Sequence, residues 1–226
     1  EVLTINAGKR VVAVDGAGNI VWASPPVPEI ESNGPQITVS DLDEDGDVEV
    51  IADVAIVDGK TGALITTLPS SAAVTTPVIA DLDLDGAKEI VLHNKVFSGD
   101  GTLLWSMPGN FAAAFAAVAD IDGDPEGELF VALANQLHVR EHDGTPIGQY
   151  LIPGMGYPGP PCMADFDSDG AVEIAIPFGN QFNMMETDGT LVWKSPISDD
   201  SGAAGCSAYD VNGDGSYEIL YADQQD

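Results

Sequence analysis

A nine-residue acidic motif recurs five times along this chain, and its spacing restricts the possible folds more than any other feature of the sequence. The copies begin at Asp41, Asp81, Asp120, Asp165 and Asp210, so their starts lie 40, 39, 45 and 45 residues apart. Each copy has an acid or amide at positions 1, 3 and 5 and a glutamate at position 9. A fixed period is typical of a repeat architecture, and about 40 to 45 residues is the length of a four-stranded propeller blade.

A hairpin pattern lies between successive acidic motifs. In each case a glycine-containing turn is flanked by β-branched and aromatic residues, which is typical of two antiparallel strands. Trp22, Trp105 and Trp193 take the same place after their turns. We expect each of them on an outer strand as a packing residue, with stacking on a ligand as the alternative. The five hairpins are expected at residues 11–22, 54–65, 95–105, 139–148 and 184–193.

Each repeat therefore predicts four short strands, one before the motif, one after it and two in the hairpin. The alanine-rich segment 110–120 comes nearest to a helical pattern, but its register places it on the innermost strand of a blade. We expect an all-β fold, a β-propeller of four-stranded blades, in which residues 1–226 form a single domain or a propeller segment.

The number of blades stays open, because six second strands accompany five hairpins and five motifs. In one interpretation the chain is a segment of a six- to eight-bladed ring. In the other it is a five-bladed ring, in which residues 10–25 complete the final blade begun at Ala204.

The acidic motif has the chemistry of a calcium loop. Side chains at positions 1, 3 and 5 alternate around a tight turn, and a glycine at position 6 lets the backbone reverse. A backbone carbonyl at position 7 and a carboxylate at position 9 complete an oxygen cage of the kind that calcium takes, with roughly six to eight ligands. Magnesium fits less well, since it demands a stricter octahedron and keeps its waters. We expect up to five Ca²⁺ ions.

Two of the five copies depart from the pattern. Asn212 replaces one carboxylate in the fifth motif, which should weaken it slightly. Pro125 stands where glycine is expected in the third, and proline fixes φ near about −65°. The expected ligands are Asp41, Asp43, Asp45, Asp47 and Glu49; Asp81, Asp83, Asp85, Ala87 and Glu89; Asp120, Asp122, Asp124, Glu126 and Glu128; Asp165, Asp167, Asp169, Ala171 and Glu173; and Asp210, Asn212, Asp214, Ser216 and Glu218.

Charge supports a cationic partner and excludes others. The chain has 37 acidic and 7 basic residues, a formal net charge of −30. Nucleic acids and anionic membrane surfaces would be repelled by this charge. No apolar run approaches the roughly 20 residues that span a bilayer, so we expect no membrane insertion. An alternative for a single motif is a polar turn with exposed aspartates, but five copies that all keep the closing glutamate disfavour it.

The five segments, written D-x-[DN]-x-D-[GP]-x-x-E, resemble the FG-GAP or VCBS-type repeats of integrin α-chain heads and of many secreted bacterial proteins. The resemblance spans essentially the entire chain, and the bacterial type is the more similar. The Phe-Gly and Gly-Ala-Pro signatures of the family are mostly absent, and only Phe178-Gly179 matches the first. The resemblance implies a calcium-loaded β-propeller, outside the cell or on its surface, that works in adhesion, in carbohydrate binding or beside an enzyme.

Outside the acidic motifs, the sequence offers two cysteines and two long loops as candidates for a disulfide and for ligand binding. Cys162 and Cys206 are expected on innermost strands of neighbouring blades, either as a disulfide or as two buried free thiols. No hydrolase triad order, phosphate loop or HExxH motif is present, so we expect no catalytic residue. Two long loops, 24–36 and 154–162, precede innermost strands. Candidates for a glycan or peptide site on that rim, with structural packing as the alternative, are Tyr157, Asn110, Phe111 and Asn180.

We therefore expect a secreted, non-catalytic, calcium-stabilised propeller that binds a glycan or an extracellular protein within a larger multidomain protein. One alternative is the propeller portion of a secreted polysaccharide lyase or of a quinone-dependent dehydrogenase. Another is a structural spacer of a surface protein or filament.

Overall fold

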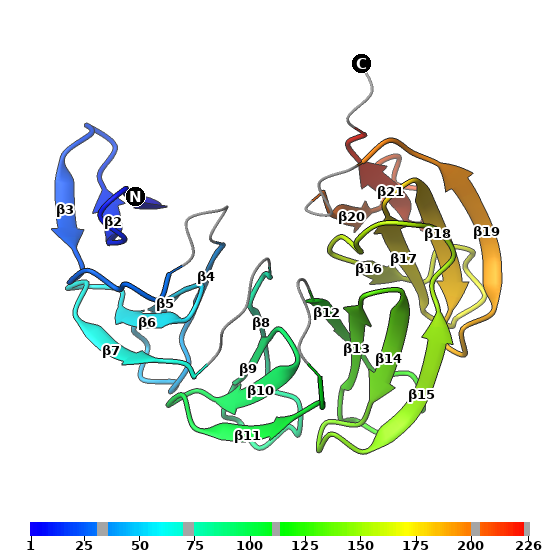
Figure 1. Cartoon of the computed structure of the whole chain (residues 1–226), viewed down its shortest axis with the longest axis horizontal. Coiled ribbons are helices and arrows are strands. Elements are labelled where there is room, and N and C mark those ends of the chain that lie inside the picture. The colour runs from blue at the N-terminus through cyan, green and yellow to red at the C-terminus, as the bar shows by residue number, and fades with distance from the viewer. Residues whose placement is uncertain (31–35, 70–74, 110–113, 200–203, 224–226) are drawn as a thin grey trace. The chain divides into compact units, whose positions relative to one another are not determined.

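The computed structural model describes residues 1–30, 36–69, 75–109, 114–199 and 204–223, and every regular element in these ranges is a β-strand (Figure 1). The strands form six antiparallel sheets, of which four have four strands, one has three and one has two. The all-β architecture of four-stranded blades is thus confirmed. Within these ranges the chain has no helix with the length and apolar character that crossing a membrane requires.

The chain divides into two compact units, Glu1–Pro108 and Gly109–Asp226. Unit 1 contains three sheets, and the strands of each sheet pair in the order in which they follow along the chain. The sheets of unit 1 are β1 (Val2–Ile5), β2 (Val11–Val14) and β3 (Ile20–Ala23); β4 (Ile37–Ser40), β5 (Glu49–Ala52), β6 (Ala55–Asp58) and β7 (Leu64–Thr67); and β8 (Val78–Ala80), β9 (Glu89–Leu92), β10 (Lys95–Ser98) and β11 (Leu103–Ser106).

Unit 2 repeats this organisation with two complete sheets and a pair of strands. Its sheets are β12 (Ala114–Ala119), β13 (Glu128–Leu133), β14 (Gln136–Arg140) and β15 (Pro146–Leu151); β16 (Cys162–Ala164), β17 (Glu173–Phe178), β18 (Gln181–Glu186) and β19 (Leu191–Pro196); and β20 (Cys206–Tyr209) and β21 (Glu218–Tyr221).

The core lies between sheets, because the two middle strands of a blade are buried on both faces. On β5, Val50 and Ala52 pack in the cluster shared with Val11 of β2. Ile51, between them, packs in a second cluster with Phe97 of β10. Since successive side chains of a strand point to opposite faces, one apolar strand contributes to two cores and holds three sheets together.

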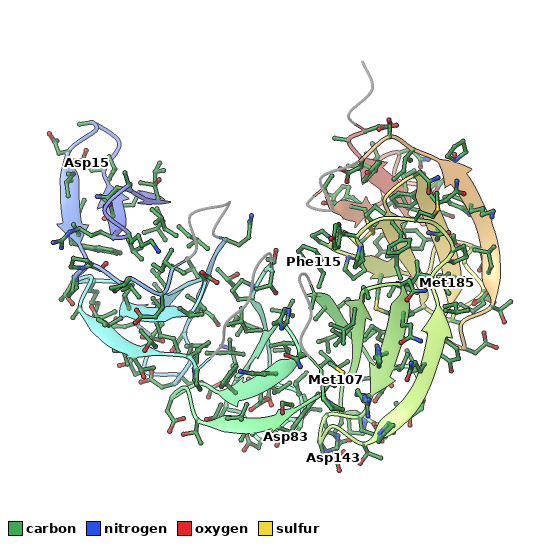
Figure 2. All side chains as sticks on the ribbon, viewed as in Figure 1. Asp15, Asp83, Met107, Phe115, Asp143 and Met185 are labelled. Carbon is green, nitrogen blue, oxygen red and sulfur yellow. A yellow bond between two sulfur atoms is a disulfide. The ribbon has the colours of Figure 1, made fainter. Side chains whose placement is uncertain are left out.

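Unit 2 is packed in the same way. Ile174 of β17 joins the cluster that contains Phe130 of β13. Met185 of β18 joins that cluster too, and Figure 2 labels its side chain. Ala175, the next residue along β17, packs instead with Ile219 of β21. Stacked sheets with alternating burial are the packing expected of propeller blades.

Of two predictions about individual strands, one is confirmed for the described residues and one is wrong. The described part of the alanine-rich segment 110–120 forms a strand, since β12 covers Ala114–Ala119 and pairs with β13, while residues 110–113 lie outside the described residues. The five-bladed interpretation is wrong about residues 10–25. Strand β2 pairs with β1 on one edge and β3 on the other, so both of its edges are filled and it does not complete the sheet of β20 and β21.

The three tryptophans lie on the outer strands β3, β11 and β19, as expected. Trp22 is 8% exposed, and its Nε1–H donates to the backbone oxygen of Gly59 over 2.9 Å. Gly62, at φ +69°, lies so close that a Cβ there would be 2.4 Å from the indole ring. A glycine turn of one blade thus covers the tryptophan of the blade before it. Trp193 is 43% exposed and stacks on Phe182 with ring centroids 6.1 Å apart.

A disulfide joins two neighbouring sheets of unit 2. Cys162 on β16 and Cys206 on β20 are bonded, with their Cα atoms 5.6 Å apart. The two strands contact each other across the sheets, so of the two states that the sequence left open the structure has the disulfide.

Trp22 should therefore contribute far more to stability than Trp193. We predict that Trp22→Ala lowers the free energy of unfolding by about 3 to 5 kcal/mol, because it empties a buried site and leaves the Gly59 carbonyl without its donor. Trp193→Ala, the matched control, should cost roughly 1 kcal/mol. Chemical unfolding followed by circular dichroism measures both, and equal losses would contradict the packing described for Trp22.

Candidate metal-binding loops

The five acidic motifs occupy equivalent places, each joining the first and second strands of a sheet. In every case the glutamate at position 9 is the first residue of the second strand. The loops, numbered here 1 to 5, are 41–49 before β5, 81–89 before β9, 120–128 before β13, 165–173 before β17 and 210–218 before β21.

One hydrogen bond closes all five loops. The backbone N–H at position 2 donates to Oε2 of the glutamate at position 9, which fixes the carboxylate over the loop. The donor and acceptor pairs are Leu42 and Glu49 (2.9 Å), Leu82 and Glu89 (2.8 Å), Ile121 and Glu128 (2.7 Å), Phe166 and Glu173 (2.7 Å), and Val211 and Glu218 (2.8 Å).

The other acidic side chains accept backbone N–H groups in a fixed order, shown here for loop 4. Gly170 N–H donates to Asp165 Oδ2 over 3.0 Å. Asp169 N–H donates to Asp167 Oδ1 over 3.2 Å, and Ala171 N–H donates to Asp169 Oδ1 over 2.8 Å. Loops 1, 2 and 5 repeat these three bonds. The repeated turn is therefore set by the side chains themselves, which hold the backbone that carries them.

Backbone strain accompanies this scaffold at position 4. Glu44, Leu84 and Ser168 have φ values of 60°, 56° and 63°. This left-handed region costs a non-glycine residue roughly 1 to 2 kcal/mol. The same position holds Gly123 and Gly213 in loops 3 and 5, also at positive φ. Strain of this kind persists where surrounding bonds hold it, and it gathers at functional sites.

Several carboxylate oxygens of the loops have no hydrogen-bond partner among the described residues. They are Asp41 Oδ1, Asp81 Oδ1, Glu128 Oε1 and Glu173 Oε1, and all four atoms are buried. Glu128 and Glu173 are 0% and 1% exposed as whole residues. A buried carboxylate oxygen without a donor is costly, so these atoms fit a bound cation.

The same loops bring their acids within reach of one ion. In four of them a set of carboxylate oxygens lies within 4.8 Å of one another, and each set is made by positions 1, 3, 5 and 9 or by three of these. An all-oxygen set of carboxylates suits calcium, magnesium or manganese rather than a softer metal. The sets are Asp41, Asp43 and Asp45; Asp81, Asp83 and Asp85; Asp120, Asp122 and Glu128; and Asp165, Asp167, Asp169 and Glu173.

The closing glutamates of loops 1 to 4 have raised pKa values, because they are buried close to other negative charges. Burial raises the pKa of Glu49, Glu89, Glu128 and Glu173 above the ordinary value of 4.5, and the negative charges of loop aspartates raise it further. The hydrogen bond from position 2 opposes the shift. In the absence of an ion, ionising these side chains therefore disfavours the folded state.

Loop 3 differs where the sequence said it should. Pro125 has no N–H, so the bond from position 6 to position 1 is missing, and Gly123 N–H donates to Asp120 Oδ1 instead, over 3.0 Å. Asp124 is absent from the acidic set of this loop.

Loop 5 departs through its amide. Asn212 Nδ2 donates to Glu218 Oε1 over 2.9 Å, so the oxygen that is free in loops 3 and 4 has a partner here.

The residues at position 7 were expected to offer backbone carbonyls, which stays a prediction. What the structure shows is that their N–H groups donate to position 5. The side chain of Asp47 forms an ion pair with Lys60. Lys88 Nζ donates to the backbone oxygen of Asp41 over 2.7 Å, which links loops 1 and 2. The sequence analysis assigned no role to Lys60 or Lys88. Their position in or near acidic segments was a possible signal, because the chain has only 7 basic residues.

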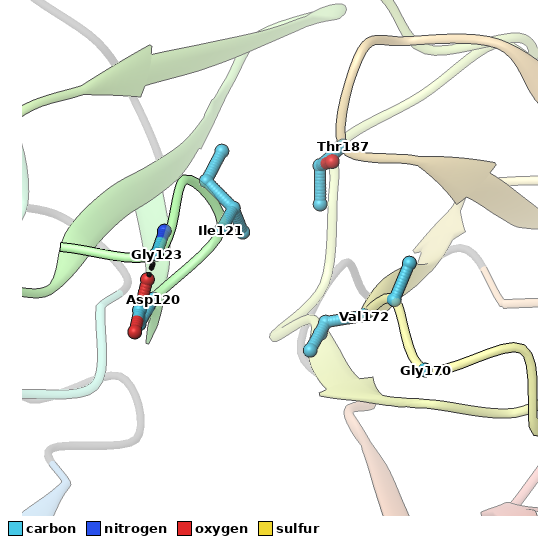
Figure 3. A pocket seen from close by; sticks show the side chains of 7 residues that line it. Asp120, Ile121, Gly123, Gly170, Val172 and Thr187 are labelled. Carbon is cyan, nitrogen blue, oxygen red and sulfur yellow. Dashed lines mark hydrogen bonds between the residues drawn. The ribbon is translucent and has the colours of Figure 1, made fainter. Parts of the chain in front are cut away.

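Pockets lie between successive loops of one unit. In unit 2 a cavity of about 300 Å³ is lined by Asp120, Ile121 and Gly123 of loop 3 on one side (Figure 3). Gly170, Ala171 and Val172 of loop 4 and Thr187 of the β18–β19 turn line the other side. In unit 1 a cavity of about 480 Å³ has the same place between loops 1 and 2.

The predicted ligand residues are only partly described. Tyr157 is 55% exposed, and its backbone oxygen accepts the N–H of Gly179 over 3.2 Å. Asn180 Oδ1 accepts the N–H of Met155 over 3.3 Å. The segment around Tyr157 therefore lies beside the β17–β18 turn, and the two residues are near each other. Asn110 and Phe111 lie outside the described residues.

Comparison with known proteins gives structural matches alone. No family model matches the sequence, and no curated protein matches it significantly. The chain is similar to the V. cholerae biofilm matrix protein Bap1, with 22% identity and a TM-score of 0.65 over 87% of this chain and 36% of that one. It is similar to BBS1N, from its complex with ARL6DN, with 12% identity and a TM-score of 0.62 over 98% and 69%.

A third match is a rhamnogalacturonan lyase of Bacillus licheniformis, with 18% identity and a TM-score of 0.59 over 94% of this chain and 48% of that one. The chain thus spans about a third of Bap1 and half of the lyase. At these identities the matches establish a β-propeller-like fold and no shared activity.

The raised pKa values predict how calcium should act at different pH. A carboxyl group with a raised folded-state pKa contributes stability below its unfolded value, and this is lost as pH rises through the folded value. The metal-free protein should therefore become more stable as pH falls from 7 toward 4.5. Because calcium binds ionised carboxylates, its increment in Tm should shrink over the same range.

The aspartates of the hairpin turns affect stability at lower pH than the closing glutamates do. Turn hydrogen bonds hold the pKa of Asp15, Asp58, Asp143 and Asp188 below the ordinary 3.8, so their contribution is lost as pH falls through still lower values. Thermal unfolding between pH 3 and 7, with calcium and with chelator, measures both effects. A calcium increment that stays constant from pH 7 to 4 would contradict the assignment.

Proposed function

We propose that this chain is a calcium-stabilised β-propeller module of the FG-GAP or VCBS type that binds a glycan or protein partner outside the cell and has no catalytic activity of its own. The observation that carries the calcium part is the set of buried carboxylate oxygens that have no partner among the described residues, at position 1 of loops 1 and 2 and at position 9 of loops 3 and 4. Calcium would supply the charge that these oxygens lack, and would be held by the acids at positions 1, 3, 5 and 9.

Binding to an extracellular partner is supported by three features of different kinds. The disulfide between β16 and β20 is of a kind that persists in oxidising compartments. Bap1, a biofilm matrix protein, has a similar fold. Exposed Tyr157 lies in a loop beside the β17–β18 turn that carries Asn180, so an aromatic surface and an amide are near each other, a combination that suits a glycan site.

A lyase-associated propeller is the second candidate, and the similarity to a rhamnogalacturonan lyase favours it. The acids that could act as a base or acid in such a reaction are held in the loop scaffold by backbone N–H groups. Incubation with rhamnogalacturonan and analysis of the products separates the two candidates, because cleavage by this chain alone would overturn the non-catalytic proposal.

Calcium binding is tested on the purified protein by calorimetric titration and by thermal unfolding, each with magnesium as a comparison. One site at about 100 times its Kd adds roughly 2.7 kcal/mol of stability. Asp169→Asn keeps an acceptor for Ala171 N–H but removes a charge from loop 4, so it should cost one ion. Asp188→Asn, the control, makes the same change in a turn outside the loops. A Tm indifferent to chelator would sink the proposal.

Partner binding is tested on a glycan array and on extracellular matrix proteins, in calcium and in chelator. We predict that Tyr157→Ala weakens the binding of whichever ligand is found at least several-fold and leaves Tm nearly unchanged, since this side chain is more exposed than buried. Binding that persists unchanged in Tyr157→Ala would remove this residue from the site.

A further inference from the structure

We propose that Glu186, at the end of β18, and Glu141, just after β14, each supply an outer carboxylate to the cation of the neighbouring loop. Glu186 would serve loop 4 and Glu141 would serve loop 3. The inference rests on the proposed calcium binding and adds two ligands that lie outside the nine-residue motif.

The strand register brings each of these glutamates to a closing glutamate. Glu186 is the direct cross-strand partner of Glu173 in the β17–β18 ladder. The β13–β14 ladder ends with the pair Leu129 and Arg140, so Glu128 and Glu141 are the next residues outward, and the charge of Glu141 helps to raise the pKa of Glu128. Like charges directly opposite each other destabilise an antiparallel pair. A cation between them would turn that repulsion into attraction.

In unit 1 the residues opposite the closing glutamates form hydrogen bonds within their own hairpin turns. Asp58 is opposite Glu49, and its Oδ1 accepts the N–H of Thr61 over 2.7 Å within its own turn. Ser98 is opposite Glu89, and its Oγ donates to Asp100 over 2.5 Å. These side chains are committed to their hairpins.

In unit 2 the turns are stabilised by different residues. Asp143 Oδ1 accepts the N–H of Thr145, and Asp188 Oδ1 accepts the N–H of Thr190, both over 2.8 Å. Glu141 and Glu186 are therefore not needed by their turns. Their carboxylates form no hydrogen bond with any described residue, and both residues are half-buried.

The charges that most affect these two glutamates belong to the loops, with smaller effects from Asp188 on Glu186 and from His142 and Asp143 on Glu141. Burial raises the pKa of Glu186, followed by the charges of Asp169 and Asp167. Burial likewise raises the pKa of Glu141, followed by Asp122 and Asp124. Each outer carboxylate is therefore close enough to the acidic set of its own blade to be affected by its charge, although it is not itself among the oxygens that lie within 4.8 Å of one another. Within that set, Oε1 of the closing Glu128 or Glu173 is buried and has no partner among the described residues.

Calcium has room for the additional ligand. The acidic set has four carboxylates in loop 4 and three in loop 3, and one backbone carbonyl is expected in addition, whereas calcium takes roughly six to eight oxygens. A carboxylate one strand away completes the shell directly or through a bound water, as position 9 of an EF-hand does. We therefore infer that the outer carboxylate raises the affinity of loops 3 and 4, and that in loop 3 it offsets the missing turn bond at Pro125.

The test compares Glu186→Gln and Glu141→Gln with wild-type protein in calcium titrations against a competing chelator. Each variant should weaken one site on the order of tenfold, since the number of charged ligands tunes loop affinity. Asp188→Asn is the matched control, because it removes one negative charge two residues away and should leave all sites unchanged.

Thermal unfolding separates a ligand from a structural residue. Without calcium, Glu186→Gln should have a Tm equal to or above that of wild type, because the repulsion with Glu173 is gone; with calcium its Tm should be lower. If Glu186→Gln and Glu141→Gln bind every ion as tightly as wild type, or if they lose the same stability in both conditions, the inference is overturned while the proposed calcium binding stands. If wild type binds no calcium, the proposed function fails first.

Discussion

Mutual repulsion of carboxylates, held close together by backbone N–H groups, is the constraint on which the rest of this structure depends. The loop side chains accept backbone N–H groups of their own loop, and in loops 1 to 4 one carboxylate oxygen from each of three or four acids lies within 4.8 Å of the others. Hydrogen bonds to the backbone settle the geometry but leave the negative charge uncompensated. The folded loops therefore have a strong negative electrostatic field even without a bound ion.

The loops are joined to the core through one residue each. The closing glutamate is both the last acid of the loop and the first residue of a buried second strand. Glu173 illustrates this, since Ile174 after it packs in one inter-sheet cluster and Ala175 in the next. A shift of that strand by one residue would move the carboxylate and exchange the two packing faces together. The geometry of the acidic loop and the stacking of the blades thus depend on the same register.

Much of this was readable from the sequence. The five-fold spacing predicted the blade length, and the second strand expected after each motif is present in every case, as β5 and β17 illustrate. Other features left no such trace. The tight turns between second and third strands hold Asp53, His93 and Ala134 at positive φ without glycine, so composition did not mark them.

The sequence was least informative where distant segments meet. The cover of Trp22 by Gly62, and the contact of Lys88 with the Asp41 carbonyl, depend on how neighbouring sheets stack. Likewise, that Glu186 faces Glu173 follows from a register shown by the ladder and not by the motif. Local sequence patterns predicted the strands and loops. The contacts between residues of different sheets depend on how the sheets pack, which the patterns do not show.

The hydrogen bonds that shape each loop span no more than seven residues of chain, the longest being that from position 2 to the closing glutamate. A loop is therefore a self-contained cassette. Insertions between cassettes leave it intact, which accounts for starts that vary from 39 to 45 residues apart while the nine-residue interior is invariant in length. Such a cassette can be duplicated together with its blade, so a protein of this design can lengthen or shorten over evolution while each added blade carries an acidic loop of the same geometry.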